Sequence, residues 1–334
     1  MKPTIKDVQK KTGLSLSTIS KYLNGGHVLD RNRELIDEAV SNLDFKVNQF
    51  ARSLKTNKSN MIGVLIPELN STFNTALVVN TQDILRRNGY GVIVCDYRSD
   101  IALERQAMQF LIDKKVDGFL AIPDERQDRV LALAIREKIP VVQIDRLVSE
   151  IETDAVIINN RAVSKKAVAD IIQMGHRRIG VITGIKNTYT MHERRAGYRE
   201  ALSEVGILYD ESLDIREEAT LTGGYNGFKR LMENVSPPSA VFLSNYEFTL
   251  GAIVAINEMG IKIGSEISVI GFDNLELAKV IIPKLTIVIQ PMEAISKTAA
   301  ELLLKRLSAK EDYPPEVIVM EARLELGDSV CNVR

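Results

Sequence analysis

The sequence predicts a bundle of three N-terminal helices followed by a two-lobed α/β region, and three observations lead to this prediction. Residues 4–45 carry apolar side chains at helical spacing, with capping residues at the ends of the stretches. From Met61 onward, short β-branched runs alternate with amphipathic helical stretches, which indicates doubly wound parallel sheets. The strand motif at residues 62–66 recurs at 179–183, about 117 residues later, which predicts two tandem lobes.

The ends of the N-terminal helices can be read from their capping residues. Thr4 and Asp7 have the spacing of a capping box at the start of the first helix, and Gly13 lies where this helix ends. Ser15 can cap the second helix. Since so few residues separate the first two helices, the segment has a helix-turn-helix pattern. The second and third helices are expected over residues 16–23 and 31–43.

A short segment connects this bundle to the α/β region. Residues 48–54, NQFARSL, can form a fourth helix, and the polar linker KTNKSN follows at 55–60. Seven residues are too few for a stable isolated helix in water. Folding of this segment must therefore depend on a partner.

The strands of the α/β region are expected at its continuous apolar runs, because strands buried on both faces of a parallel sheet lack polar alternation. Parallel strands in open sheets bind ligands at their carboxyl ends, so a ligand cleft is expected between the two lobes. The predicted runs are MIGVLI, GVIVC, GFLAI, VVQI, AVII, RIGVIT, AVFL and ISVIGF, followed by a last strand at 323–326.

Charge and composition narrow the class of protein. The whole chain has a net charge of −1, but residues 1–60 carry +5 and the remainder −6, so a basic segment precedes an acidic body. Two cysteines, Cys95 and Cys331, are too few for a disulfide framework and are expected to be free thiols. The N-terminus lacks an apolar signal stretch and no run is long enough to span a membrane, so we expect a soluble cytoplasmic protein.

Catalytic and metal-binding motifs are missing from the sequence. No phosphate-binding loop, G-x-S-x-G motif or paired carboxylates are present, which argues against an enzyme and against a cofactor. The histidines His27, His176 and His192 have no metal-binding spacing, and His176 is expected to be structural, at a turn from helix to strand.

The stretch TIKDVQKKTGLSLSTISKYLN, followed by NQFARSL, resembles the lactose-repressor (LacI/GalR) family of bacterial transcription regulators. The resemblance continues through the segments at 116–118, 144–146, 175–180, 271–273 and 285–286. It implies a helix-turn-helix DNA-binding domain, a hinge helix with its linker, and a periplasmic-binding-protein-like core that binds the effector and dimerises. These parts correspond to residues 1–46, 47–60 and 61–334, with an N-terminal lobe of about 61–159 and 290–318 and a C-terminal lobe of about 160–289 and 319–334.

In the second helix, Ile19 and Leu23 must pack inward, which leaves the opposite face exposed. The family reads bases with the positions of Leu16, Ser17 and Lys21; Leu16 can contact a thymine methyl, and Lys21 replaces a common arginine with a point donor. The alternative is an ordinary solvated helix face. The resemblance assigns DNA-backbone and hinge contacts to Thr4, Ser15, Ser20, Asn24, His27, Asn48, Arg52, Leu54 and Lys55.

Among these residues, Leu54 has the most specific expected role. In the family, hinge helices pair in the minor groove and leucines at this position wedge into a base step. The alternative, a leucine that caps a core, fits poorly with its neighbours Arg52, Ser53 and Lys55. Val47 replaces the proline that often precedes the hinge asparagine, so the free hinge should be less ordered.

The resemblance also assigns an effector site between the lobes, whose carboxylates, amides and arginine suit hydrogen bonding to vicinal hydroxyls. For each residue singly, a turn cap or a surface ion pair is an alternative. Two departures leave the ligand open: the usual stacking aromatic is Ala219, and Tyr246 replaces the Asp that follows the cleft asparagine. The effector-binding residues are Phe73, Asn74, Asp145, Arg194, Asn245, Tyr246, Asp273 and Gln290.

We therefore expect a DNA-binding transcriptional regulator, a repressor of a carbohydrate-utilisation operon, controlled allosterically by a sugar or sugar phosphate. Its partners would be pseudo-palindromic operator DNA and a second copy of the chain in a homodimer. Alternatives are a purine-like effector, a phosphorylated carrier protein as corepressor, a solute-binding protein without DNA function, and a doubly wound enzyme.

Overall fold

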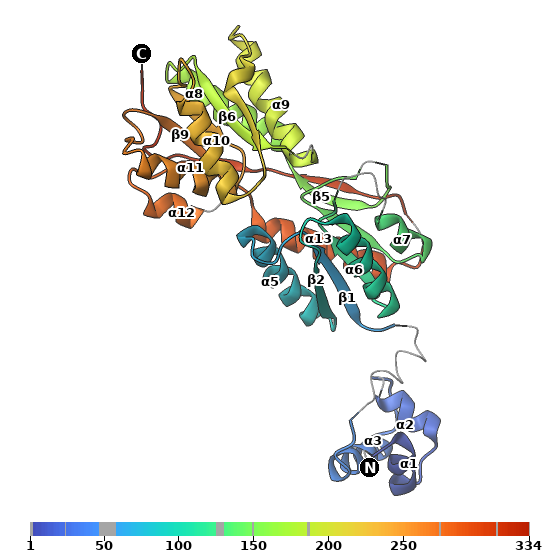
Figure 1. The fold of residues 1–334 in the computed structure, drawn as a ribbon. Coiled ribbons are helices and arrows are strands. Elements are labelled where there is room, and N and C mark those ends of the chain that lie inside the picture. Colours follow the sequence, from blue (N-terminus) through green and yellow to red (C-terminus); the bar gives the residue numbers. More distant parts are fainter. Residues whose placement is uncertain are drawn as a thin grey trace. The chain divides into compact units, whose positions relative to one another are not determined.

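The computed structural model divides the chain into two compact units, Met1–Asn60 and Met61–Arg334 (Figure 1). The residues that the structure describes are 3–23, 25–46, 58–124, 130–148, 150–185, 188–273, 275–311 and 313–333.

Among its described residues, the first unit has three helices around a small apolar core of Val8, Ile19, Ile36 and Ala39. The helix-turn-helix prediction is confirmed. The carboxylate of Asp7 accepts hydrogen bonds from the backbone N and the Oγ1 of Thr4, both at 2.8 Å. The helices are α1 (Ile5–Thr12), α2 (Leu16–Leu23) and α3 (Asp30–Asn42).

The first sheet of the second unit has six parallel strands in the order β11-β5-β4-β3-β1-β2. Its strands are β1 (Met61–Ile66), β2 (Gly91–Asp96), β3 (Gly118–Ala121), β4 (Val141–Ile144), β5 (Asp154–Ile158) and β11 (Val317–Met320). Its helices are α5 (Thr72–Arg87), α6 (Ile101–Asp113), α7 (Leu131–Arg136) and α13 (Met292–Ser308).

The second sheet has the order β12-β10-β9-β8-β6-β7, parallel except for β12, which runs antiparallel to β10. Its strands are β6 (Ile179–Gly184), β7 (Asp214–Glu217), β8 (Ala240–Leu243), β9 (Ser268–Phe272), β10 (Thr286–Ile289) and β12 (Arg323–Glu325). The associated helices are α8 (Asn160–Gln173), α9 (Tyr189–Glu204), the 3-10 turn η1 (Glu211–Leu213), α10 (Leu221–Met232), α11 (Tyr246–Glu258) and α12 (Leu275–Val280).

Each sheet is covered by helices on both faces, as β1 illustrates. Ile62, Val64 and Ile66 belong to the apolar cluster that contains the buried side chains of α5 and α13. Leu65, which points to the other face because side chains alternate along a strand, belongs to the cluster of α6 and α7. The doubly wound architecture is confirmed, and the repeated motif forms β1 and β6, which hold the same place in their sheets.

The chain passes between the lobes after β5, after β10 and after β11. The strand β11 ends at Met320, two residues beyond the lobe boundary expected at about 318. The strands β7, β10 and β11 were missing from the predicted runs. β7 has the polar sequence DIRE, and β11 is an edge strand whose side chains alternate between exposed and half-buried.

No helix among the described residues is long and apolar enough to cross a membrane.

Candidate DNA-binding and ligand sites

The exposed face of α2 carries the three residues predicted to read bases. Leu16, Ser17 and Lys21 are exposed, whereas Ile19 is fully buried and Leu23 is half-buried against the same core. Leu16 presents an apolar side chain on this face, with 37% of its surface exposed. The predicted orientation of this helix is confirmed.

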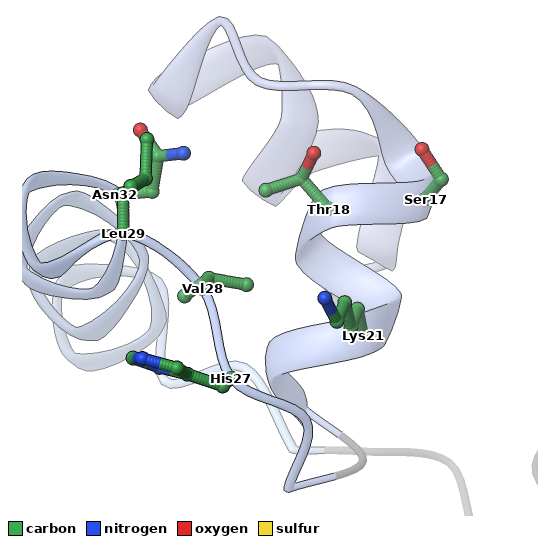
Figure 2. A pocket seen from close by; sticks show the side chains of 7 residues that line it. All are labelled: Ser17, Thr18, Lys21, His27, Val28, Leu29 and Asn32. Carbon is green, nitrogen blue, oxygen red and sulfur yellow. The ribbon is translucent and has the colours of Figure 1, made fainter.

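Beside this face lies a hollow of about 440 Å³ between α2 and the start of α3. Figure 2 shows Ser17 and Lys21 on α2 and His27 on the loop that leads to α3. The lining therefore combines an ammonium, an imidazole and hydroxyls, which are donors suited to phosphate or base edges. It consists of Ser17, Thr18, Lys21, His27, Val28, Leu29 and Asn32.

Two of the predicted backbone contacts use their side chains as helix caps. The Oγ of Ser15 accepts from the backbone N of Thr18 at 3.2 Å and lies 2.7 Å from the Oγ of Ser17. Thr4 is held by Asp7, as described above. Ser20 is half-buried on α2. The predicted contacts Asn24, Asn48, Arg52, Leu54 and Lys55 lie outside the described residues.

In the second unit, Arg194 on α9 is the buried cation of the predicted effector site, with 3% of its surface exposed. Its Nε donates to the Oδ1 of Asn160 and its Nη1 to the carbonyl oxygen of Ser244, both at 2.7 Å. The guanidinium lies over the ring of Phe272, 3.7 Å from its centroid. The sequence analysis did not identify Asn160, Ser244 and Phe272 as partners of Arg194. Their positions at strand ends and at the start of α8 could have indicated that they belong to the site.

Two aspartates at strand ends belong to the same cluster. Asp145 follows β4 in one lobe and Asp273 follows β9 in the other, with φ values of 65° and 67°. Asp273 accepts a hydrogen bond from the Nε2 of Gln290 at 2.7 Å. Burial raises the pKa of Asp273 to about 6, and it also raises the pKa of Asp145, while the charge of Arg194 opposes both shifts. The structure thus brings Asp145, Arg194, Asp273 and Gln290 together.

Glu247 is a further member that the sequence analysis did not single out. It lies in the first turn of α11, two residues after Asn245. Burial raises its pKa to about 7, and the carboxylates of Asp273 and Glu68 add to the rise. Its position close to the predicted asparagine was the only signal in the sequence.

The other predicted effector residues are engaged locally. The Oδ1 of Asn245 caps α11 by accepting from the backbone N of Phe248 at 2.8 Å. The Nδ2 of Asn74 donates to the carbonyl oxygen of Glu68 at 2.7 Å. Phe73 packs half-buried against the apolar core, and Tyr246 is half-buried at the start of α11. For the two asparagines, the side chain serves as a turn or helix cap, which was the alternative to a ligand contact.

His176 has the structural place expected from the sequence, between α8 and β6. Its ring contacts the Oγ of Ser239 at 2.8 Å, the Oγ of Ser268 at 2.9 Å and the carbonyl oxygen of Cys331 at 3.1 Å. Burial lowers its pKa. Both cysteines are free thiols, and the described residues contain no group of side chains that could hold a metal ion.

Comparisons with known proteins agree with this architecture. Residues 168–330 match the family model of the periplasmic binding protein-like domain. The chain is 31% identical to the ribose operon repressor of Haemophilus influenzae, covering 99% of both chains, and 31% identical to the HTH-type transcriptional repressor PurR of Vibrio atlanticus, covering 96% of both.

Solved structures give the same result. A transcriptional regulator CelR–cellobiose complex is 26% identical with a TM-score of 0.75 and covers 98% of this chain and 99% of that one. The lac repressor dimer bound to operator, 23% identical, has the same fold, with a TM-score of 0.87 over 99% of this chain and 100% of that one. From the full-length match to the repressor relatives and the helix-turn-helix unit ahead of a two-lobed core, we conclude that this chain belongs to the lactose-repressor (LacI/GalR) family of bacterial transcription regulators.

Proposed function

We propose that this regulator is a repressor that binds a pseudo-palindromic operator as a homodimer and senses a sugar in the site around Arg194. The observation that carries the proposal is the pairing of two features in one chain. One is an α2 face whose polar and basic side chains are exposed. The other is a set of half-buried carboxylates, buried amides and a buried guanidinium drawn from both lobes.

The DNA-binding half of the proposal rests on α2 and its surroundings. Leu16, Ser17 and Lys21 would read base edges in the major groove, with Ser20 and His27 close to phosphates. The hinge residues Asn48, Arg52, Leu54 and Lys55 would enter the minor groove, as the resemblance implies. The Thr4 and Ser15 caps would then fix the helix ends that approach the DNA backbone.

The sensing half rests on donor and acceptor chemistry. Vicinal hydroxyls both donate and accept, so they match carboxylates, amides and a guanidinium better than a flat base does. The ring of Phe272 is covered by Arg194 on one face, and Ala219 provides no aromatic surface, which disfavours a stacked purine. Relatives named for ribose and a structure with cellobiose support a sugar, while the PurR relatives keep a purine as the alternative to test.

The mechanism would be a shift between two arrangements of the lobes. A ligand that contacts Asp145 in one lobe and Arg194 in the other changes their equilibrium by its differential affinity for the two arrangements. The lobes are joined by three chain crossings, about which one lobe could rotate relative to the other. In a dimer, such a rotation would change the spacing between the two hinge segments. A protein that binds operator DNA would act in the bacterial cytoplasm. This function would require no catalysis.

Fluorescence anisotropy with a labelled palindromic segment from the promoter beside its own gene tests the proposal. We expect salt-dependent binding of the full-length chain and a tenfold or larger change of affinity with one member of a panel of sugars, sugar phosphates and purines. A scrambled segment of equal length is the control. Equal affinity for both segments would contradict operator recognition, and a response to purines alone would contradict the sugar.

A further inference from the structure

The turn that follows α2 contains two adjacent glycines, Gly25 and Gly26. The backbone N–H of Gly25 donates to the carbonyl oxygen of Tyr22 at 2.9 Å, and that of Gly26 donates to the carbonyl oxygen of Lys21 at 2.8 Å. This pair of hydrogen bonds is a Schellman motif, which folds the chain back over the end of a helix. The turn therefore lies against the last turn of α2, which carries Lys21.

The two glycines are required for different reasons. Gly25 has a φ of 78°, in the left-handed region, where a side chain is strained although the space around it is open. Gly26 lies outside that region, so other residues could adopt its backbone conformation. A glycine at such a position lowers stability, because it raises the entropy of the unfolded chain. The reason for glycine at this position must therefore come from its contacts.

The atoms nearest to a Cβ placed on Gly26 belong to Lys21. This Cβ would lie 2.7 Å from the Cγ of Lys21 and 2.9 Å from its carbonyl oxygen. Both distances are too short for van der Waals contact. An alanine at this position would therefore displace the side-chain stem of Lys21 or lift the turn away from α2. With glycine, the stem packs directly against the backbone of the turn.

This packing restricts where the ammonium of Lys21 can lie. Lysine has a flexible four-carbon stem, and the loss of its freedom opposes binding. A stem that already rests against the turn has lost part of this freedom before DNA arrives. Lys21 lines the hollow beside α2 together with His27, which directly follows Gly26 in the chain (Figure 2). The contact at Gly26 therefore also sets the place of Lys21 relative to His27.

We propose that Gly26 is a positioning residue for operator recognition, which directs the ammonium of Lys21 toward base edges by leaving room for its stem. The inference rests on the proposed base-reading role of Lys21. It deepens that role, because it assigns part of the operator specificity to a residue without a side chain. Since Gly26 acts through Lys21, its effect must disappear when the lysine is removed.

The experiment is fluorescence anisotropy of the full-length chain with a palindromic segment from the promoter beside its own gene and with a scrambled segment of equal length. We expect Gly26→Ala to weaken specific affinity about tenfold and to change affinity for the scrambled segment less than about twofold. The matched control is Gly25→Ala, which adds the same methyl group in open space but at an unfavourable φ. It should lower the melting midpoint and change specific affinity less than about twofold.

A double-mutant cycle separates positioning from support of the turn. In Lys21→Ala, which has no Cγ to displace, a further Gly26→Ala should change specific affinity less than about twofold. If Gly26→Ala lowers the melting midpoint, the double variant should recover part of the loss, and no recovery overturns the proposal. Equal weakening by Gly26→Ala in both backgrounds, unchanged specific affinity in Gly26→Ala, or equal weakening by Gly25→Ala and Gly26→Ala also overturns it.

A measurement without DNA tests the position of Lys21 separately from the proposed function. Reductive methylation with isotope-labelled formaldehyde gives each lysine amine of the full-length chain a resonance, and the one missing from Lys21→Ala belongs to Lys21. We expect Gly26→Ala to shift and sharpen this resonance, because the released stem moves more freely, and Gly25→Ala to leave it unchanged. An unchanged resonance in Gly26→Ala overturns the proposal. Absence of operator selectivity in the unmodified chain contradicts the proposed function, while the resonance still reports whether Gly26 holds Lys21.

Discussion

The guanidinium of Arg194 lies over the ring of Phe272, 3.7 Å from its centroid. Phe272 is the last residue of β9 and precedes Asp273, so one stacking contact fixes the cation beside the carboxylate that it partly neutralises. A guanidinium stacks flat on a ring, whereas an ammonium cannot. The contact therefore depends on arginine in particular.

Arg194→Lys is expected to keep the positive charge but lose the stack and the paired hydrogen bonds. We expect the free energy of unfolding to fall by about 1–3 kcal/mol, the usual effect of losing hydrogen bonds to a charged group. Ligand response should be lost, while operator binding is retained. Urea denaturation and operator anisotropy measure the two effects.

The matched control for that variant is Arg161→Lys on α8. Arg161 forms ion pairs with Glu193 and Glu200, and 44% of its side chain is exposed. An exposed pair contributes roughly 0–1 kcal/mol, so this variant should behave like the unmodified chain. Similar losses in both variants would mean that the stack has no special role.

The pH dependence of stability should reveal the titration of Glu247 in the folded chain. Its pKa is about 7 in the folded chain, against an ordinary value of 4.5. Between these two pH values the folded state binds more protons than the unfolded state, so the free energy of unfolding falls as the pH rises and levels off above the window. Asp273, with a pKa of about 6 against 3.8, adds a fall of the same sign at lower pH.

Glu247→Gln removes one source of this fall. We expect the variant to exceed the unmodified chain in stability by about 1 kcal/mol or more at pH 8, and the difference to vanish toward pH 4.5. Urea denaturation at several pH values measures this difference, with Glu233→Gln at the exposed end of α10 as the comparison. A constant difference across the pH range would show that Glu247 does not titrate in this window.

Much of the fold could be predicted because its signals are local. Ile19 and Leu23 repeat at helical spacing, and the continuous apolar runs GFLAI and AVFL indicate strands buried on both faces. The edge strand β11 and the polar strand β7 gave no such signal, because half of each is in contact with solvent. Their positions are set by pairing with β5 and β6, which local sequence does not encode.

The site was predicted in part for a related reason. Arg194, Asp145, Asp273 and Gln290 lie at positions that the family pattern marks, and the structure groups them. The raised pKa of Glu247 could not be predicted, because it results from burial, and burial is determined only when the lobes pack. Asn245 and Asn74 have predictable places, but their local hydrogen bonds depend on the conformation of the adjacent turns.

Lys21→Ala tests base reading by α2. If Lys21 contacts a base, the variant should lose about 1–3 kcal/mol of specific operator affinity and keep its affinity for scrambled DNA. A phosphate contact would instead weaken both and lower the salt slope by about one. Anisotropy titrations at several salt concentrations distinguish the two. Lys166→Ala, at an exposed position of α8, is the control and should change neither.

Leu54→Ala tests the wedge that the sequence predicts in the hinge. We expect specific operator affinity to fall about tenfold or more, because the kinked base step loses its apolar support. Ligand binding, measured by calorimetry, should be unchanged. Equal operator affinity of the two proteins would refute the wedge.

Gly197→Ala tests how closely α9 must approach α8 to place Arg194. A Cβ at Gly197 would lie 2.3 Å from the carbonyl oxygen of Arg161 and 2.8 Å from the backbone N of Lys165. These are backbone atoms, so the helices must separate, and overpacking of this kind costs roughly 1–3 kcal/mol. The better helix propensity of alanine returns about 1 kcal/mol of it.

The separation would also act on the site, since Arg194 lies one helical turn before Gly197. Moving α9 lengthens the 2.7 Å hydrogen bonds from Arg194 to Asn160 and Ser244, so we expect a weaker ligand response as well as a lower free energy of unfolding. Ser203→Ala, at an exposed position of the same helix, should change neither property. Loss of stability with an unchanged ligand response would show that the helix contact supports the fold without positioning Arg194.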